Sequence, residues 1–394
     1  MPAADASRLL VVDDNADNRD VLTRRLGRLG YTSIETAENG RAALDLMARA
    51  LAAETPYDTV LLDVMMPVMN GLQVLEALAA DAALKETPVI MISAATEMET
   101  VVRCIELGAE DYLPKPFNAV LLRARLGAVL EKKRLRDEAA RHLQRLEREL
   151  AEARQQQLSM VPDEFPRVDP THPVTVHGTM LPAREVGGDL YDCFDAAPGV
   201  LCLAIGDVSG KGMPAALFMA RTRSLLRASA LQHAAATGAP PAPSAVIEVL
   251  NEELCKNNPS GMFVTLWLGF LDIASGELRF VNAGHPRPYR LGDAVSEIAT
   301  KPGPPLGVME GIRHADHAAV LERGEALVLI TDGLPEMTDA AGAFYSLERV
   351  EADLRLLSAA TPEEITAALT AKVLAFAEGV PAADDVTVLA ARRG

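Results

Sequence analysis

One stretch carries most of the information about the second half of the chain: Glu185-Val-Gly-Gly-Asp-Leu-Tyr-Asp192, followed by Val200-Leu-Cys-Leu-Ala-Ile205 and Gly206-Asp-Val-Ser-Gly-Lys-Gly212. Two aspartates, Asp189 and Asp207, each follow a glycine near the end of a predicted strand. Glycine allows close backbone approach, and strands of one packed core can direct such carboxylates to one point. The stretch therefore predicts two converging acids.

Two later segments add further acids at strand edges. Thr331-Asp332-Gly333 follows the apolar run 326–330, and Asp384-Asp385 precedes Val386-Thr-Val-Leu389. Neighbouring carboxylates repel one another unless a cation neutralises them, and hard divalent cations prefer oxygen ligands. A dinuclear metal centre is predicted from four acids: Asp189, Asp207, Asp332 and Asp385.

Length, charge and cysteine content exclude several classes of protein. The 394 residues allow two or three domains, and the formal net charge of -17 disfavours nonspecific binding to nucleic acid or to an anionic membrane. No apolar run approaches the roughly 20 residues of a membrane span, and the first residues lack a signal-peptide pattern. The four cysteines have neither metal-type nor disulfide-type spacing. We expect a cytoplasmic protein.

The first 130 residues alternate between strand and helix patterns. Strands are predicted at 8–12, 33–37, 59–63, 89–93 and 109–113, with helices at 18–29 and 40–53 and further helical segments after them. This alternation predicts a doubly wound α/β domain with a five-stranded parallel sheet, whose ligands bind at the carboxyl ends of the strands. The polar residues at those ends are Asp13, Asp14, Asp63, Ser93 and Lys115.

Those five residues form a coherent phosphoryl-transfer site. Asp13 and Asp14 would help to hold Mg2+ beside a nucleophilic Asp63. Ser93 and Lys115 would bind the oxygens of the phosphoryl group. The motifs Val11-Val-Asp-Asp14, Asp63-Val-Met-Met-Pro67 with Gly71, Ser93-Ala94 and Tyr112-Leu-Pro-Lys-Pro116 resemble the response-regulator receiver domain over residues 7–128.

The receiver resemblance implies roles for individual residues. It makes Asp63 the phosphoacceptor and Lys115 the essential cation, and it makes Ser93 and Tyr112 the pair that moves on phosphorylation. It implies that the backbone carbonyl of Met65 joins Asp13, Asp14 and Asp63 around the Mg2+. The implied donor is a histidine kinase or a phosphotransfer protein.

Residues 118–160 are predicted to form a helix, because charges of both signs alternate and neither glycine nor proline interrupts 128–161. Apolar residues follow the 4-3-4-3 spacing of a coiled-coil seam at Ala139, Leu143, Leu146, Leu150 and Ala153. Two interpretations stay open: a single helix lying on its own domains, or a coiled coil that forms a homodimer. Pro162, Pro166 and Pro170 would end the helix. The predicted domains are a receiver at 1–128, a helical linker at 129–161 and a third domain at 162–394.

The third domain mixes runs of strands with runs of helices, which predicts an α+β sandwich flanked by helices. The predicted strands are 171–181, 186–194, 200–207, 262–271, 278–282, 326–331 and 385–390, and the predicted helices are 213–236, 244–257, 347–357 and 362–377. Segments 234–243 and 293–312 are predicted to be surface loops.

The acidic motifs, with Pro214-Ala-Ala216, Asn282-Ala-Gly-His-Pro286 and Thr331-Asp-Gly-Leu-Pro-Glu336, resemble the PPM, or PP2C-like, metal-dependent Ser/Thr phosphatases over residues 172–391. The resemblance is to the bacterial branch that acts on anti-sigma factor antagonists of the STAS type. It implies two Mn2+ or Mg2+ ions bound by Asp189 and Asp207, with the Val208 carbonyl nearby. Asp332 and Asp385 would complete the second metal's ligands.

Several neighbouring residues have two open interpretations. Arg184 would bind the substrate phosphate or be a surface charge, and Glu185 would orient a metal-bound water or lie at a strand edge. His285 would act as an acid toward the leaving oxygen or stabilise a turn. Asp192 and Asp384 would bind metal through water or face solvent.

Other outputs fit the sequence less well. A diguanylate-cyclase turn requires an acid where Leu190 stands, and a P-loop requires glycine at Ile205 and Ser or Thr at Gly212. A DNA-binding output lacks a basic helix-turn-helix segment. We expect a response regulator whose output is a metal-dependent protein phosphatase controlled through Asp63. The alternative is a regulator that sequesters a partner of a sigma-factor pathway, with weak or no catalysis.

Overall fold

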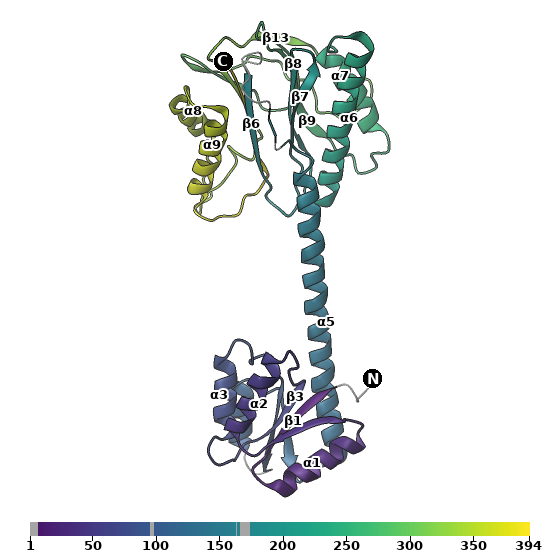
Figure 1. The fold of residues 1–394 in the computed structure, drawn as a ribbon, viewed down its shortest axis with the longest axis vertical. Helices are drawn as coiled ribbons and strands as arrows, with labels where there is room; N and C mark the ends of the chain where they lie inside the picture. Colours follow the sequence, from purple (N-terminus) through teal and green to yellow (C-terminus); the bar gives the residue numbers. More distant parts are fainter. Residues whose placement is uncertain (1–6, 95–97, 163, 166–173) are drawn as a thin grey trace. The chain divides into compact units, whose positions relative to one another are not determined.

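A computed structural model of the protein describes residues 7–94, 98–162, 164–165 and 174–394. The chain divides into two compact units, Met1–Leu146 and Glu147–Gly394 (Figure 1). Helix α5 (Ala119–Leu158) begins in the first unit and ends in the second. Among the described helices, none combines the length and the apolar character that crossing a bilayer demands.

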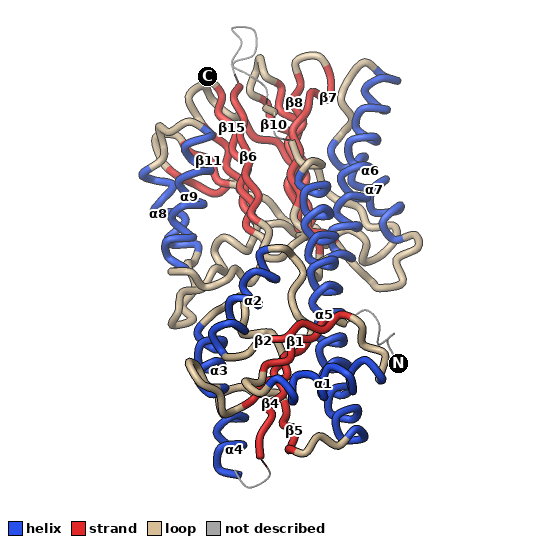
Figure 2. Tube along the Cα trace, turned by 60° about the horizontal axis from the view of Figure 1, so that its bottom comes forward, coloured by secondary structure: helices blue, strands red, loops and turns tan. Residues whose placement is uncertain are grey.

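The first unit is a five-stranded parallel sheet with helices on both faces (Figure 2). Its strands, in the order β2-β1-β3-β4-β5, are β2 (Ser33–Ala37), β1 (Arg8–Val12), β3 (Thr59–Asp63), β4 (Val89–Ala94) and β5 (Asp111–Lys115), and its helices are α1 (Ala16–Arg28), α2 (Gly40–Ala52), α3 (Gly71–Ala80), α4 (Met98–Glu106) and the start of α5. Side chains alternate across each strand, so Leu10 and Val12 pack toward α2 and α3 while Leu9 and Val11 pack toward α1 and α5. The predicted doubly wound fold is confirmed.

The last strand of this sheet lies two residues later than predicted. The amide of Ala109 donates to the carbonyl of Cys104 at the end of α4, and Gly108 has a positive φ of 98°. Because the backbone here closes a helix, pairing with β4 begins only at Asp111. Lys115 is therefore the final residue of β5, whereas the predicted strand ended at residue 113.

The second unit contains two five-stranded sheets whose described pairings are antiparallel. One has the order β13-β10-β9-β8-β7, made of β13 (His317–Val320), β10 (Glu277–Ala283), β9 (Val264–Asp272), β8 (Val200–Val208) and β7 (Leu190–Ala197). The other has the order β12-β11-β14-β15-β6, made of β12 (Val295–Glu297), β11 (Tyr289–Leu291), β14 (Ala326–Ile330), β15 (Val386–Arg393) and β6 (Val174–Leu181). The helices are α6 (Met213–Thr237), α7 (Pro243–Cys255), α8 (Leu347–Leu356) and α9 (Pro362–Ala377).

The two sheets stack face to face, and a helix pair covers the outer face of each (Figure 1). Strand alternation builds three apolar layers. On β9, Leu266 and Leu268 pack toward α6 and α7, whereas Trp267 packs between the sheets. On β15, Leu389 joins the layer between the sheets and Val388 packs toward α8 and α9. The predicted α+β sandwich flanked by helices is confirmed.

The predicted strand at 186–194 is shifted: β7 begins at Leu190. The backbone groups of residues 187–189 bond to the side chains of Gln157 and Asp385, so they are not available to a strand ladder. Asp189 thus stands just before a strand instead of near its end. The short strands β11, β12 and β13 were not predicted, and β12 lies in the segment predicted as a loop. The start of the predicted strand at 171–181 and Pro166 and Pro170 lie outside the described residues.

Candidate active site and receiver site

Asp385 anchors the loop between β6 and β7. Its Oδ1 accepts the amide of Ala183 at 2.8 Å, and its Oδ2 accepts the amides of Gly188 at 2.6 Å and Asp189 at 3.3 Å. The loop can approach this closely only because residue 187 is glycine: a Cβ there would lie 2.1 Å from the Asp385 Oδ2. Two carboxylate oxygens offer about four lone-pair sites, so three amides leave room for a cation.

Asp189 is buried, with 1% of its surface exposed, beside this loop. Its Oδ2 accepts the hydroxyl of Thr331 at 2.8 Å and that of Thr387 at 2.5 Å. Burial raises the pKa of Asp189 well above its ordinary value, as do the charges of Asp207 and Asp385, while the two hydroxyls oppose the rise. The threonines stand in the predicted motifs, one beside Asp332 and one two residues after Asp385, but the sequence indicated no role for them.

Asp207, near the end of β8, lies close to the other acids. Its pKa is raised to about 7: burial is the largest cause, the charges of Asp332 and Asp384 add to the rise, and a hydrogen bond with Asp189 opposes it. Two carboxyl groups at hydrogen-bond distance must share a proton or a cation. Burial and Asp384 also raise the pKa of Asp332.

The structure therefore gathers all four predicted acids at one end of the sandwich, and it adds Asp384. Asp384 forms an ion pair with Lys211 at 3.0 Å, a contact that neither open interpretation included. Within the described ranges, the oxygens of three of these acids do not all fall within 4.8 Å of one another, as those of the receiver acids do. Threonine hydroxyls hold Asp189, and loop amides hold Asp385.

The two interpretations of Asp192 are both wrong. Its side chain is fully buried and pairs with Arg223 (Nε to Oδ2, 3.3 Å) and with Arg227 (Nε to Oδ2, 3.0 Å) of α6. Alternation along β7 explains this, because Leu190, Asp192 and Phe194 all point toward α6. Asp192 attaches a helix to the sheet and takes no place beside the metal-type acids.

The three remaining candidates, His285, Arg184 and Glu185, differ in burial. His285 is buried, and burial lowers its pKa to about 3, so it is neutral and poorly suited to donate a proton. Its amide donates to Asn282 Oδ1 at 2.8 Å and its Nδ1 contacts the Thr265 hydroxyl at 3.1 Å, which favours the turn-stabilising interpretation. Arg184 and Glu185 are exposed in the β6–β7 loop, and Glu185 is not at a strand edge.

Besides Thr331 and Thr387, a third residue of this site was missed by sequence reasoning. Gln157, in the last turn of α5, is 4% exposed and makes hydrogen bonds to both backbone groups of Gly187. A glutamine within a charged helix carries little signal, although three consecutive glutamines at 155–157 end an otherwise charged run. The end of the linker helix thus contacts the loop that holds Asp385.

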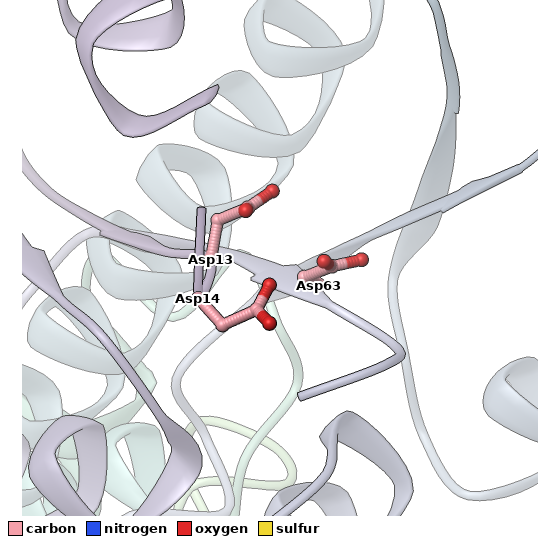
Figure 3. A group of neighbouring side chains, drawn as sticks. All are labelled: Asp13, Asp14 and Asp63. Atoms are coloured by element: carbon pink, nitrogen blue, oxygen red, sulfur yellow. The ribbon is translucent and has the colours of Figure 1, made fainter. Parts of the chain in front are cut away.

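The receiver site is compact. Asp13, Asp14 and Asp63 bring carboxylate oxygens within 4.8 Å of one another (Figure 3). Lys115 Nζ lies 2.9 Å from Asp13 Oδ2 and 2.8 Å from Asp63 Oδ2. Burial raises the pKa of Asp63, and the bond to Lys115 opposes it. Burial lowers the pKa of Lys115, but the two acids outweigh burial and the pKa is raised.

The other receiver candidates stand on strands of the same sheet or just after one. Ser93 is buried at the end of β4, and Tyr112 is half-buried on β5 with the Arg125 guanidinium 5.6 Å from its ring centre. Met65 is 67% exposed beyond Asp63. Asn18, which the sequence did not single out, donates from Nδ2 to Asp13 at 3.1 Å and holds that carboxylate in place.

Comparison with known proteins agrees with this architecture. The family model "Stage II sporulation protein E (SpoIIE)" matches residues 197–394, and the model "Response regulator receiver domain" matches residues 9–127. Protein IcfG of Synechocystis sp. is 28% identical over 267 residues, covering 62% of this chain and 41% of IcfG. Response regulator MprA of Mycolicibacterium vanbaalenii is 42% identical over 125 residues, covering 32% of this chain and 51% of MprA.

The chain thus spans about half or less of these two relatives. Among solved structures, the SiaA-PP2C domain of Pseudomonas aeruginosa shares the fold with a TM-score of 0.54, covering 64% of this chain and 98% of that chain at 20% identity. The SpoIIE match covers half of the chain and includes three of the four clustered acids. The chain therefore belongs to the SpoIIE family, and it carries a receiver domain ahead of its SpoIIE, or PP2C-like, domain.

Proposed function

We propose that the protein is a response regulator whose output is metal-dependent hydrolysis of phosphoserine or phosphothreonine on another protein. The observation that carries this proposal is the convergence of buried carboxyl groups, with Asp207 bonded to Asp189 and with Asp332 and Asp384 nearby. Burial, reinforced by the charges of Asp332 and Asp384, raises the pKa of Asp207 to about 7, although the hydrogen bond with Asp189 opposes the rise. Divalent cations relieve such crowding of acids. The donor set of carboxylates and a backbone carbonyl fits Mn2+ or Mg2+.

The residues that would hold two metal ions are Asp189, Asp207, Asp332, Asp385 and the carbonyl of Val208. A Cβ at residue 188 would lie 2.8 Å from that carbonyl oxygen, so Gly188 keeps the carbonyl accessible. When bound, such metals supply a hydroxide at neutral pH and neutralise phosphate oxygens. The chain's own contribution is orientation: Thr331 and Thr387 position Asp189, and the loop amides position Asp385. Arg184 is exposed and is a candidate to bind substrate phosphate.

In the receiver, Asp63 would accept a phosphoryl group from a histidine kinase or phosphotransfer protein. Asp13, Asp14, Asp63 and the Met65 carbonyl would hold Mg2+, because the three carboxylates converge there and Lys115 offsets only part of their charge. The phosphoryl oxygens would then be bound by Lys115 and Ser93, with Tyr112 responding to the change.

Control would pass along α5. The start of this helix belongs to the receiver core through Leu122 and Leu126, and its last turn carries Gln157. Between them, Leu143 and Leu146 are 59% and 45% exposed, as expected of a seam that awaits a second copy. A homodimeric coiled coil, of the kind predicted for 129–161, would cover them.

The proposed substrate is an anti-sigma factor antagonist of the STAS type, and the proposed compartment is the cytoplasm, where the four free cysteines would stay reduced. The deciding experiment measures phosphate release from a phosphoserine-containing antagonist with Mn2+, before and after receiver phosphorylation by acetyl phosphate. Metal-dependent release that changes with receiver phosphorylation is the expected result. Tight binding of the antagonist without release would favour the sequestering regulator instead.

A further inference from the structure

A cavity of about 500 Å³ opens beside Asp332 in the second unit. It lies between the end of β14, strands β11 and β12, and the start of α8, and its lining includes Ile330, Tyr289, Phe344 and Leu347. Phe344 is 60% exposed and Leu347 is 46% exposed, although both are large apolar side chains. A cavity lined by exposed apolar side chains is a binding site more often than an open part of the surface is.

The wall that carries Phe344 is held in place. The amide of Tyr345 donates to the carbonyl of Met337 at 2.8 Å, Thr338 pairs with Phe344 across the turn, and Tyr345 itself is buried. The next residue, Ser346, has a φ of 72°, in the region that favours glycine, and its amide donates to the Pro335 carbonyl at 2.9 Å. Such a conformation is unfavourable for a residue other than glycine and persists only where surrounding contacts impose it.

The cavity adjoins the proposed metal centre, because Asp332 lines the cavity and its charge acts on Asp207. Consecutive Cα atoms lie about 3.8 Å apart, so a phosphorylated residue bound near Asp332 places residues one or two positions away within reach of the cavity. Most of the cavity's lining is apolar. Its charged lining residues are Asp332, Glu336 and the pair Arg287 and Glu297, which form an ion pair at 3.1 Å.

We propose that this cavity, hereafter the flanking pocket, binds an apolar side chain of the phosphoprotein substrate that lies one or two residues from the phosphorylated serine or threonine. The inference rests on the proposed phosphatase function and gives it a sequence preference. Burial of an apolar side chain against Phe344 and Leu347 supplies affinity that the metal centre, which contacts only phosphate, cannot supply. The flanking pocket thus selects among phosphoproteins.

The test uses the full chain and short phosphoserine peptides in a Gly/Ser background, each with a single leucine at one position on either side of the phosphoserine, and matched peptides with aspartate there. We expect leucine at one flanking position to raise kcat/KM about tenfold over aspartate. In the Leu347→Glu variant, we expect kcat/KM to be about equal for the leucine and aspartate peptides. Leu374→Glu is the matched control, because Leu374 is also 46% exposed but lies on α9 away from the cavity, and it retains the ratio.

The other outcomes of this experiment also support or overturn the flanking pocket. A wild-type ratio near one, or an unchanged ratio in Leu347→Glu, would overturn the flanking pocket. Phe344→Ser, at an exposed turn, provides a second variant should Leu347→Glu fail to fold. If the wild type hydrolyses neither the peptides nor p-nitrophenyl phosphate, the proposed function fails. Fluorescence anisotropy of the same peptides then tests the pocket alone: a leucine preference that Leu347→Glu abolishes supports it, and equal binding of all peptides refutes it.

Discussion

The side chain of Gln157 bonds to both backbone groups of Gly187: its Nε2 donates to the carbonyl at 2.5 Å, and its Oε1 accepts the amide at 3.0 Å. The next residue, Gly188, donates its amide to Asp385. Helix α5 begins in the receiver core, and near its end it bonds to Gly187 in the β6–β7 loop. The residue after Gly187 bonds to the proposed metal ligand Asp385. Any rotation of the last turn of α5 would move that loop, since the paired groups are buried and have no alternative partner in water.

Replacing Gln157 with leucine should uncouple the two domains. The variant leaves both Gly187 groups without their partner, which costs about 1–3 kcal/mol and loosens the loop. We expect the apparent Mn2+ affinity, read from the metal dependence of hydrolysis, to fall about tenfold and the response to receiver phosphorylation to disappear. Gln156→Leu is the control, because its exposed side chain leaves the loop untouched. A Gln157→Leu enzyme that still responds as the wild type does would exclude this route.

Gly187→Ala should disable the same loop by a different route. The added Cβ would lie 2.1 Å from Asp385 Oδ2, a distance at which the carboxylate or the loop must move. Hydrolysis should fall at least about a hundredfold, and Mn2+ binding measured by calorimetry should weaken. Gly127→Ala, where a Cβ meets nothing within 4 Å, is the control and should keep full activity. Wild-type metal binding in Gly187→Ala would contradict the loop geometry.

Asp207→Asn should abolish hydrolysis while the domain stays folded. Asparagine keeps the volume of the side chain but removes a charge that a divalent ion requires from its ligands. Phosphate release and metal content are the measurements, with circular dichroism to check folding. Full activity at normal metal content would show that Asp207 is not a metal ligand.

The metal-free protein should lose stability as the pH rises from about 4 to about 7. The folded-state pKa of Asp207 is raised from 3.8 to about 7, so over this window the folded chain binds more protons than the unfolded chain, and the free energy of unfolding falls with increasing pH. The loss contributed by this group is on the order of a few kcal/mol. Thermal unfolding in EDTA across this range measures it. Asp207→Asn should lose less stability than the wild type, and equal slopes would refute the shift.

Asp63→Asn should leave the phosphatase centre intact and remove its control. The amide cannot accept a phosphoryl group, while the Lys115 side chain can still bond to Asp13. Phosphorylation by acetyl phosphate, followed on a phosphate-affinity gel, should vanish, and the Mn2+-dependent rate should become independent of the donor. A variant whose rate still changes with acetyl phosphate would place the acceptor elsewhere.

Local sequence patterns were enough to predict the two fold classes and the acids that would serve each site. Strand and helix periods are local patterns, and the carboxyl ends of parallel strands meet at one edge, so Asp13, Asp63 and Lys115 could be grouped in advance. Glycine next to aspartate likewise marked Asp189 and Asp207 as points of close approach. In both cases the signal lies within a few residues of the group that it places.

The hydrogen-bond partners of these acids follow from tertiary packing and could not be predicted. Thr387 bonds to Asp189 across 198 residues of sequence, and Ala183 bonds to Asp385 across 202. The tertiary structure also showed that Asp192 pairs with α6, whereas Asp384 joins the acid cluster. It placed Gln157 against the β6–β7 loop. Periodicity tells which face of a strand a side chain takes, but the partner on that face comes from a distant segment. That pairing is set by how the two sheets and their helices pack, and no local pattern records it.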